Sequence, residues 1–233
     1  SELRRGRRTA NAEFGNAASV LVGDFLYSRA FQMMLGANSM RVMQVLADAT
    51  NIIAEGEVLQ LMNCRNADIE VNEYLRVIRY KTAKLFEAAG RLGAILGNAS
   101  PDIEEAMAAY GTHVGTAFQL IDDVLDYSGK EADTGKHLGD DLAEGKPTLP
   151  LIHVIQHGSP QQAALVRSAI ENASGDSFAE VLAAVRCSGA LDVARRHGVD
   201  EAEMAKAALA PLPDSMFKET LLQLADFAVQ RSF

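Results

Sequence analysis

The sequence is short of cysteine and of basic residues, and each shortage argues against a class of protein. Cys64 and Cys187 are the two cysteines among 233 residues. They could pair, but such sparse use is typical of a reduced, cytoplasmic chain. Lysine and arginine number 22 against 31 aspartates and glutamates, which gives a net charge of −9. Because nucleic-acid phosphates are bound through positive charge, we expect no nucleic acid as a partner.

Long apolar runs and alternating patterns are lacking as well. Asp24 and Arg29 interrupt the best apolar candidate, so no segment reaches the roughly 18 apolar residues of a membrane span. We also expect no signal peptide. No stretch alternates apolar and polar residues with the period of two that a half-buried strand shows. Hydrophobic residues nevertheless make up 48% of the chain, which predicts one sizeable core and a single domain over 1–233.

Helical periodicity is the dominant pattern and predicts an all-α bundle. In the first long segment, Asp24, Ser28 and Gln32 recur every four residues and form a polar stripe on an apolar helix. Such stripes are typical of a bundle that encloses a cavity, although hydrogen bonds between helices produce them too. Shorter helices are predicted after Pro147, among them 189–197 and 200–209. The long helices are predicted at 17–35, 39–63, 69–96 (with Asp68 as a cap) and 101–128.

An aspartate cluster stands inside an apolar helix, in the stretch FQLIDDVLDYSG that begins at Phe118. Asp122 and Asp126 are four residues apart, so one face of the helix presents both carboxylates, with Asp123 beside them. Like charges at this spacing destabilise a helix unless a cation or water relieves the repulsion. A solvated acidic face gives the same pattern. The apolar neighbours favour a hard divalent cation with oxygen ligands, such as Mg²⁺.

The glycine-rich stretch GKHLGDDLAEGKPT follows this helix and places Lys136 and Lys146 just beyond the aspartates. Acids and bases together fit a diphosphate, because metal ions link it to the aspartates while lysines neutralise its outer oxygens. A nucleotide-binding P-loop is rejected. Pro147 stands where that motif needs serine or threonine, and no strand precedes the loop.

These stretches together resemble the second aspartate-rich region of the trans-isoprenyl diphosphate synthase family. RRG at 4–6, GEVLQL at 56–61 and YKTA at 80–83 match further family motifs, so the likeness covers nearly the whole chain. FGNAASVLVGD and AEGEVLQLMN are most similar to the bacterial long-chain members, the octaprenyl diphosphate synthases in particular. The resemblance implies an isoprenoid synthase helical bundle around a central apolar cavity.

The family joins an allylic diphosphate to successive isopentenyl diphosphates, here in the biosynthesis of a quinone side chain such as that of ubiquinone. Loss of diphosphate leaves an allylic cation, the isopentenyl double bond attacks it, and a proton is removed. The resemblance implies three Mg²⁺ ions per active site and both diphosphates as substrates. It also implies a homodimer in the cytoplasm, with peripheral association with a membrane for product delivery.

The resemblance also assigns the metal ligands and the residues near the reacting carbons. Asp122 matches the direct metal ligand, Asp126 its partner, and Asp141 a ligand through water. Thr82 and Gln119 match positions where hydroxyl and carbonyl dipoles steady the cation. A threonine bonded back to its own helix is the plainer interpretation of Thr82.

Basic residues complete the expected site. Lys81, Lys136 and Lys146 match the lysines that grip the allylic diphosphate. Arg4 matches a further contact to that diphosphate, and Arg5 a contact to isopentenyl diphosphate. An ordinary lysine lying along an apolar surface is the alternative for Lys81.

A growing chain needs an apolar tunnel whose floor limits product length. Met34 and Leu46 flank the predicted turn between the first two long helices and are large enough to form that floor. Met34 lies about 25 Å beyond Ala17, which is near the diphosphate end, at roughly 1.5 Å per helical residue. Both residues could equally be ordinary core.

The family carries a first DDxxD immediately before RRG, and this sequence starts just after that place. We therefore expect residues 1–233 to lack the N-terminal part of the domain and to be inactive alone. Two other functions stay open: a class I terpene cyclase, and a non-catalytic regulatory subunit of a heteromeric prenyl synthase. RRG, YKTA and GKPT favour a chain elongator over a cyclase, and the intact second motif with its lysines speaks against a regulatory subunit.

Overall fold

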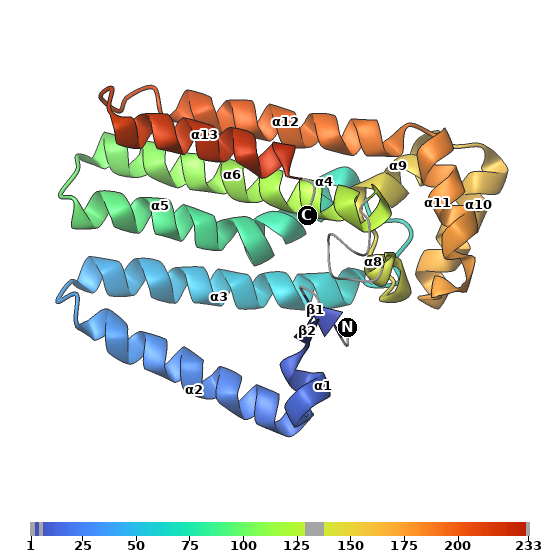
Figure 1. The fold of residues 1–233 in the computed structure, drawn as a ribbon, viewed down its shortest axis with the longest axis horizontal. Coiled ribbons are helices and arrows are strands. Elements are labelled where there is room, and N and C mark those ends of the chain that lie inside the picture. Colours follow the sequence, from blue (N-terminus) through green and yellow to red (C-terminus); the bar gives the residue numbers. More distant parts are fainter. Residues whose placement is uncertain (1–2, 5–6, 129–137, 232–233) are drawn as a thin grey trace.

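The computed structural model describes residues 3–4, 7–128 and 138–231, and nearly all regular structure in them is helical (Figure 1). The exception is a short ladder in which β1 (Leu3–Arg4) pairs antiparallel with β2 (Arg7–Arg8). Two residues per strand are too few to produce an alternating pattern, so the sequence shows no sign of it. The predicted all-α fold class is confirmed.

The long helices lie side by side as rods, and α6 is the central one (Figure 1). It packs between α5 and α12, α3 packs against the far side of α5, and α13 covers α12 and α6. Their bounds are α2 (Asn16–Leu35), α3 (Met40–Asn63), α5 (Lys84–Leu96), α6 (Pro101–Ser128), α12 (Ala190–Ala208) and α13 (Met216–Gln230).

Shorter elements complete the chain, most of them near the end of the bundle where α6 ends (Figure 1). They are α1 (Ala10–Phe14), α4 (Val71–Ile78), the π-helical segment η1 (Arg79–Ala83), α8 (Asp140–Ala143), α9 (Leu149–His157), α10 (Pro160–Asn172), the 3₁₀ turn η2 (Gly175–Ser177) and α11 (Phe178–Cys187). α9 packs against α6 and α12, and α10 packs against α9.

Two helix predictions need correction. The helix expected from about residue 69 begins at Val71, because Glu70 rather than Asp68 is its N-cap and forms a capping box with Glu73. The two helices expected at 189–197 and 200–209 are one, α12. Gly198 stands at the predicted break, but it is packed against α6: a Cβ there would lie 3.1 Å from Ile121 Cδ1. Close packing therefore favours glycine at this point of a continuous helix.

The core lies under the C-terminal half of α6. Leu120, Ile121 and Val124 are at most 1% exposed. Tyr127, one turn further on, is fully buried among side chains of α9, α10 and α11. Because protein interiors are close-packed, this half of α6 is a firm base for the polar side chains on its other face.

α2 is the exception to this close packing. None of its side chains, all of which belong to the described part of the chain, is buried. Large apolar residues such as Leu21 (68% exposed) and Phe25 (65% exposed) face outward. In Figure 1 the helix diverges from α3 beyond their connecting turn. Helix α2 thus presents an exposed apolar surface in this structure.

Candidate functional site

The polar residues predicted for the site come from three parts of the fold that meet at one end of α6. Thr82, in η1, donates a hydrogen bond from Oγ1 to Gln119 Oε1 on α6 at 3.0 Å. The backbone N–H of Asp141, in α8, donates to Asp126 Oδ2 on α6 at 3.3 Å. Helix α6 thus connects the YKTA segment with the glycine-rich loop, although these are far apart in sequence.

The segment that carries Lys81 and Thr82 is a π-helical turn within an otherwise α-helical rod. α3 packs closely against it at Gly56: a Cβ there would lie 2.6 Å from Lys81 N and 2.9 Å from Lys81 Cα. Only a glycine allows two backbones to approach this closely. Single π turns inside α-helices are frequent at functional sites, and this one directs Thr82 toward Gln119 on α6 and Lys81 toward Glu57 on α3.

Lys81 and Lys146 are both held by carboxylates. Lys81 Nζ lies 3.0 Å from Glu57 Oε2 on α3, and both side chains keep contact with solvent. Lys146 Nζ lies 3.0 Å from Asp141 Oδ1 and 2.6 Å from Glu144 Oε2. Burial alone would lower the pKa of Lys146, but these two carboxylates outweigh burial and raise it. Lys146 is therefore a permanent positive charge beside the aspartates.

Asp123, the middle residue of the aspartate motif, is buried beneath the site rather than exposed in it. It is 4% exposed, whereas the side chain of Asp122 is 35% exposed. Tyr74 Oη donates to Asp123 Oδ2 at 2.6 Å, and Gln119 Nε2 donates to Asp123 Oδ1 at 2.8 Å. Burial raises the pKa of Asp123, and the Asp141 carboxylate adds to the rise while the hydrogen bonds from Tyr74 and Gln119 oppose it.

Arg231 at the end of α13 is a site residue that sequence reasoning missed. Its guanidinium lies 3.7 Å from the ring centroid of Phe118 and donates to Phe118 O at 2.6 Å. Nη2 is also 3.6 Å from Asp122 Oδ1. The side chain is only 8% exposed, and its Nε has no hydrogen-bond partner among the described residues. No local pattern signals this residue, because 113 positions separate it from Phe118.

Some predicted residues are placed only partly. Arg5 and Lys136 lie outside the described residues, and Arg4 is described only by its backbone in β1. Met34 near the end of α2 and Leu46 in α3 are both half-buried. Their roles remain predictions.

Asp122 and Asp126 are candidate ligands for a divalent metal ion. Among the described residues, no three His, Cys, Asp or Glu side chains gather closely enough to hold one. Asp122 and Asp126 are nevertheless hard oxygen donors one helical turn apart. Mg²⁺ usually takes one or two carboxylates together with substrate phosphates, so this pair fits such an ion.

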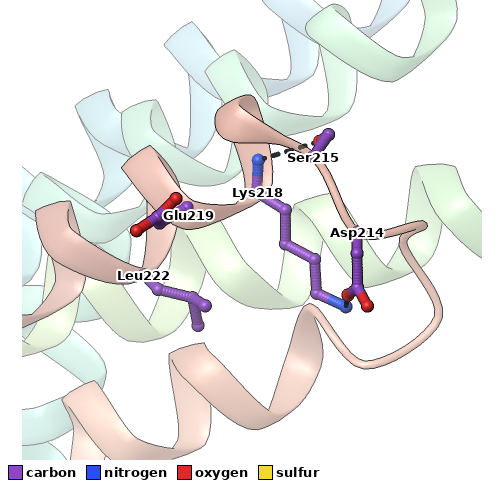
Figure 2. A pocket seen from close by; sticks show the side chains of 5 residues that line it. All are labelled: Asp214, Ser215, Lys218, Glu219 and Leu222. Atoms are coloured by element: carbon purple, nitrogen blue, oxygen red, sulfur yellow. Dashed lines mark hydrogen bonds and ion pairs between the residues drawn. The ribbon is translucent and has the colours of Figure 1, made fainter.

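Two further findings bear on where function lies. A shallow pocket of about 280 Å³ lies at the other end of the bundle, where α13 begins, and is shown in Figure 2. Lys218 in this pocket donates to Leu212 O and pairs with Asp214, so its charge stabilises the turn before α13.

Among the described residues, none of the helices has the length and apolar character that a membrane span requires.

The fold and the site together define an all-α enzyme that presents carboxylates and lysines at one end of a helical bundle. The chain belongs to the polyprenyl synthetase family, whose model matches residues 1–186, and it is a prenyltransferase.

Individual relatives agree with this assignment. The octaprenyl diphosphate synthase of Escherichia coli (strain K12) is 53% identical over 232 residues, which span 99% of this chain and 72% of that protein. A polyprenyl synthase from Caulobacter crescentus CB15, crystallised with calcium and isoprenyl diphosphate, superposes with a TM-score of 0.96 at 44% identity. A decaprenyl diphosphate synthase from Rhodobacter capsulatus gives 0.92 at 42%. Both alignments cover 100% of this chain and 72% of the other.

Proposed function

We propose that this prenyltransferase extends an allylic diphosphate with isopentenyl diphosphate to an octaprenyl product that becomes a quinone side chain. The observation that carries the proposal is the meeting of Asp122, Asp126 and Lys146 with the Thr82–Gln119 pair at one end of α6. Similarity to octaprenyl and decaprenyl diphosphate synthases supports a long product.

In the proposed chemistry, charged side chains bind the diphosphate and polar side chains stabilise the allylic cation. Lys81 and Lys146 neutralise the outer oxygens of the allylic diphosphate as its C–O bond breaks and the electron pair leaves with it. The Thr82 and Gln119 oxygens face the allylic cation that remains. Isopentenyl diphosphate then attacks with its double bond and loses a proton.

Divalent cations complete this site in the proposal, and we place three of them per active site. Asp122 would be a direct ligand with Asp126 as its partner, and Asp141 would hold an ion through water. When bound, they supply positive charge that links the diphosphate to the aspartates. The calcium present with isoprenyl diphosphate in the Caulobacter enzyme supports this assignment.

The test is product analysis with enzyme expressed from the complete reading frame that encodes this chain. With radiolabelled isopentenyl diphosphate, farnesyl diphosphate and Mg²⁺, we expect products of about eight units after dephosphorylation and chromatography. Chelation with EDTA should abolish them. Products no longer than geranylgeranyl, or cyclised hydrocarbons, would contradict the proposal.

We further propose that the enzyme is a cytoplasmic homodimer that touches membranes to deliver its product. The exposed apolar surface of α2 supports a protein partner for that helix. Analytical ultracentrifugation measures the first property, and flotation with phosphatidylglycerol vesicles, with and without product, measures the second. A monomer at micromolar concentration that leaves vesicles unbound would contradict both.

A further inference from the structure

Beneath the site lies a buried hydrogen-bond chain that none of the proposed binding roles explains. It runs from Tyr74 on α4 through Asp123 and Gln119 on α6 to Thr82 in η1. Tyr74 and Asp123 are 5% and 4% exposed, so neither reaches a diphosphate or an ion in solvent. Gln119 and Thr82 are half-buried at the upper end of the chain. A buried polar pair of this kind costs desolvation energy unless fully hydrogen-bonded, and here both carboxylate oxygens have a donor.

The chain determines which way the Gln119 amide points. Its Nε2 donates to Asp123 Oδ1, which leaves its Oε1 to accept from Thr82 Oγ1. The reversed amide would set Oε1 against Oδ1, two acceptors in a buried place, and would lose the bond to Asp123. Tyr74 donates a hydrogen bond to the other carboxylate oxygen, Asp123 Oδ2, and so holds the carboxylate plane in position.

The direction of this amide matters because the proposed reaction develops positive charge. An amide oxygen directed at an allylic cation stabilises it, whereas the N–H₂ end of the same amide opposes it. Oriented dipoles contribute most when they need no reorganisation at the moment of reaction. Tyr74 and Asp123 supply this orientation from below, while Gln119 alone could rotate about its terminal torsion.

We propose that Tyr74 is a positioning residue for the prenyl-transfer step: through Asp123 it holds the Gln119 amide with its oxygen toward Thr82 and the reacting carbons. This inference rests on the proposed function. It also assigns Asp123 to the support of the site, so that the aspartate motif contributes two carboxylates to ion binding and one to positioning.

The test compares Tyr74→Phe with a matched variant in enzyme from the complete reading frame. Tyr74→Phe removes only the hydroxyl, and supporting groups of this kind typically change activity about 10- to 100-fold. We expect kcat to fall by that factor, with KM for both diphosphates and the Mg²⁺ activation curve unchanged. Tyr110→Phe is the control, because Tyr110 is also 5% exposed and donates to Leu221 O at 2.7 Å, on the face of α6 toward α13. It should lower the melting temperature while leaving kcat unchanged.

A double-mutant cycle then tests whether Tyr74 acts through Gln119. In a Gln119→Ala background the amide is gone, so Tyr74→Phe should cause no further loss of kcat. The inference would be overturned if Tyr74→Phe and Tyr110→Phe had the same kcat. It would also be overturned if the losses of kcat from Tyr74→Phe and Gln119→Ala multiplied in the double variant. If Tyr74→Phe does not fold, Asp123→Asn takes its place in the same cycle. A wild-type enzyme that makes no polyprenyl product contradicts the proposed function instead, so the two failures are distinguishable.

Discussion

At the residue scale, the three carboxylates of the aspartate motif do not share the same surroundings. Asp122 and Asp126 lie on the face of α6 that turns toward Arg231 and the glycine-rich loop. Asp123, one residue along, is rotated by about 100° around the helix and is buried against Tyr74. A rotation of that size moves a side chain from the site into the core. The same rotation places Asp122 beside the Arg231 guanidinium and Asp123 between the buried donors Tyr74 and Gln119.

Asp122 is predicted to be needed for metal-dependent turnover. Asp122→Ala removes a half-exposed carboxylate, and Arg231 keeps its contacts with Phe118, so folding should survive. Turnover should fall by at least about a hundredfold, as when a well-placed charge-stabilising group is lost. Asp102→Ala, which removes an exposed acid in the first turn of the same helix, is the control. Near-normal turnover of Asp122→Ala at saturating Mg²⁺ would contradict the assignment.

Glu201 forms a separate hydrogen-bond network that stabilises the fold. Its carboxylate accepts from Arg79 Nη2 at 3.0 Å and lies 2.6 Å from His113 Nδ1. Burial would raise the pKa of Glu201, but the hydrogen bonds from His113 and Arg79 outweigh it and lower the pKa. A lowered folded pKa means that this stabilisation is fully present above roughly pH 5 and is lost as the pH falls through the folded pKa.

We therefore predict that Glu201→Gln lowers the free energy of unfolding by about 1–2 kcal/mol at neutral pH, a modest value because Arg79 is partly exposed. The difference from wild type should shrink below about pH 4. Urea denaturation between pH 3.5 and 7 measures both quantities. Glu203→Gln, at an exposed position two residues away, should change little. A difference that grows toward low pH would refute this account.

At the element scale, the π turn η1 and the close approach of α3 position the YKTA residues. The turn lies between α4 and α5, and together the three form the single rod that the sequence predicts from residue 69 to 96. The backbone of Lys81 occupies the place that a side chain at position 56 would need. Gly56 in α3 and Lys81 in η1 are 25 positions apart in the sequence, and the two elements meet here through backbone atoms.

Gly56→Ala is predicted to displace η1 and to reduce activity. Its added Cβ would lie 2.6 Å from Lys81 N, a contact that only a backbone shift relieves. Since misplacing catalytic groups by about 1 Å costs on the order of a hundredfold, kcat should fall strongly and the melting temperature should fall too. Gly93→Ala on α5 is the matched control, because a Cβ there meets nothing within 4 Å. Alanine should stabilise that helix by about 0.5–1 kcal/mol. Unchanged kcat in Gly56→Ala would show that the close approach does not position the site.

For the whole molecule, the bundle separates the candidate site from the end where the product-length floor is predicted. Aspartates, lysines and the buried Tyr74 chain gather where α6 ends, whereas the turn between α2 and α3 lies at the opposite end of the rods (Figure 1). A product that starts at the aspartates and grows along the helices would therefore extend toward that turn.

Replacing Met34 or Leu46 by Ala is predicted to lengthen the products without changing the chemistry. Both side chains are half-buried near the α2–α3 turn, so their removal opens space while the aspartates and lysines stay in place. Chromatography of dephosphorylated products measures chain length. Met33→Ala, at a neighbouring position that is 70% exposed, is the control. If both variants keep the parental product distribution, the floor lies elsewhere.

Local patterns in the sequence predict most of the helices and the residue types of the candidate site. Helical periodicity indicates the helices, although Glu70 replaces the expected cap Asp68. The paired spacing of Asp122 and Asp126 presents two carboxylates on any helix. The tertiary structure alone decided that Asp123 is buried against Tyr74, that Gly56 meets the π turn, and that Arg231 reaches Asp122. Each of these depends on which distant helices pack together. Packing in this fold joins residues as far apart as Arg79 and Glu201, which are 122 positions apart, beyond the reach of any local pattern.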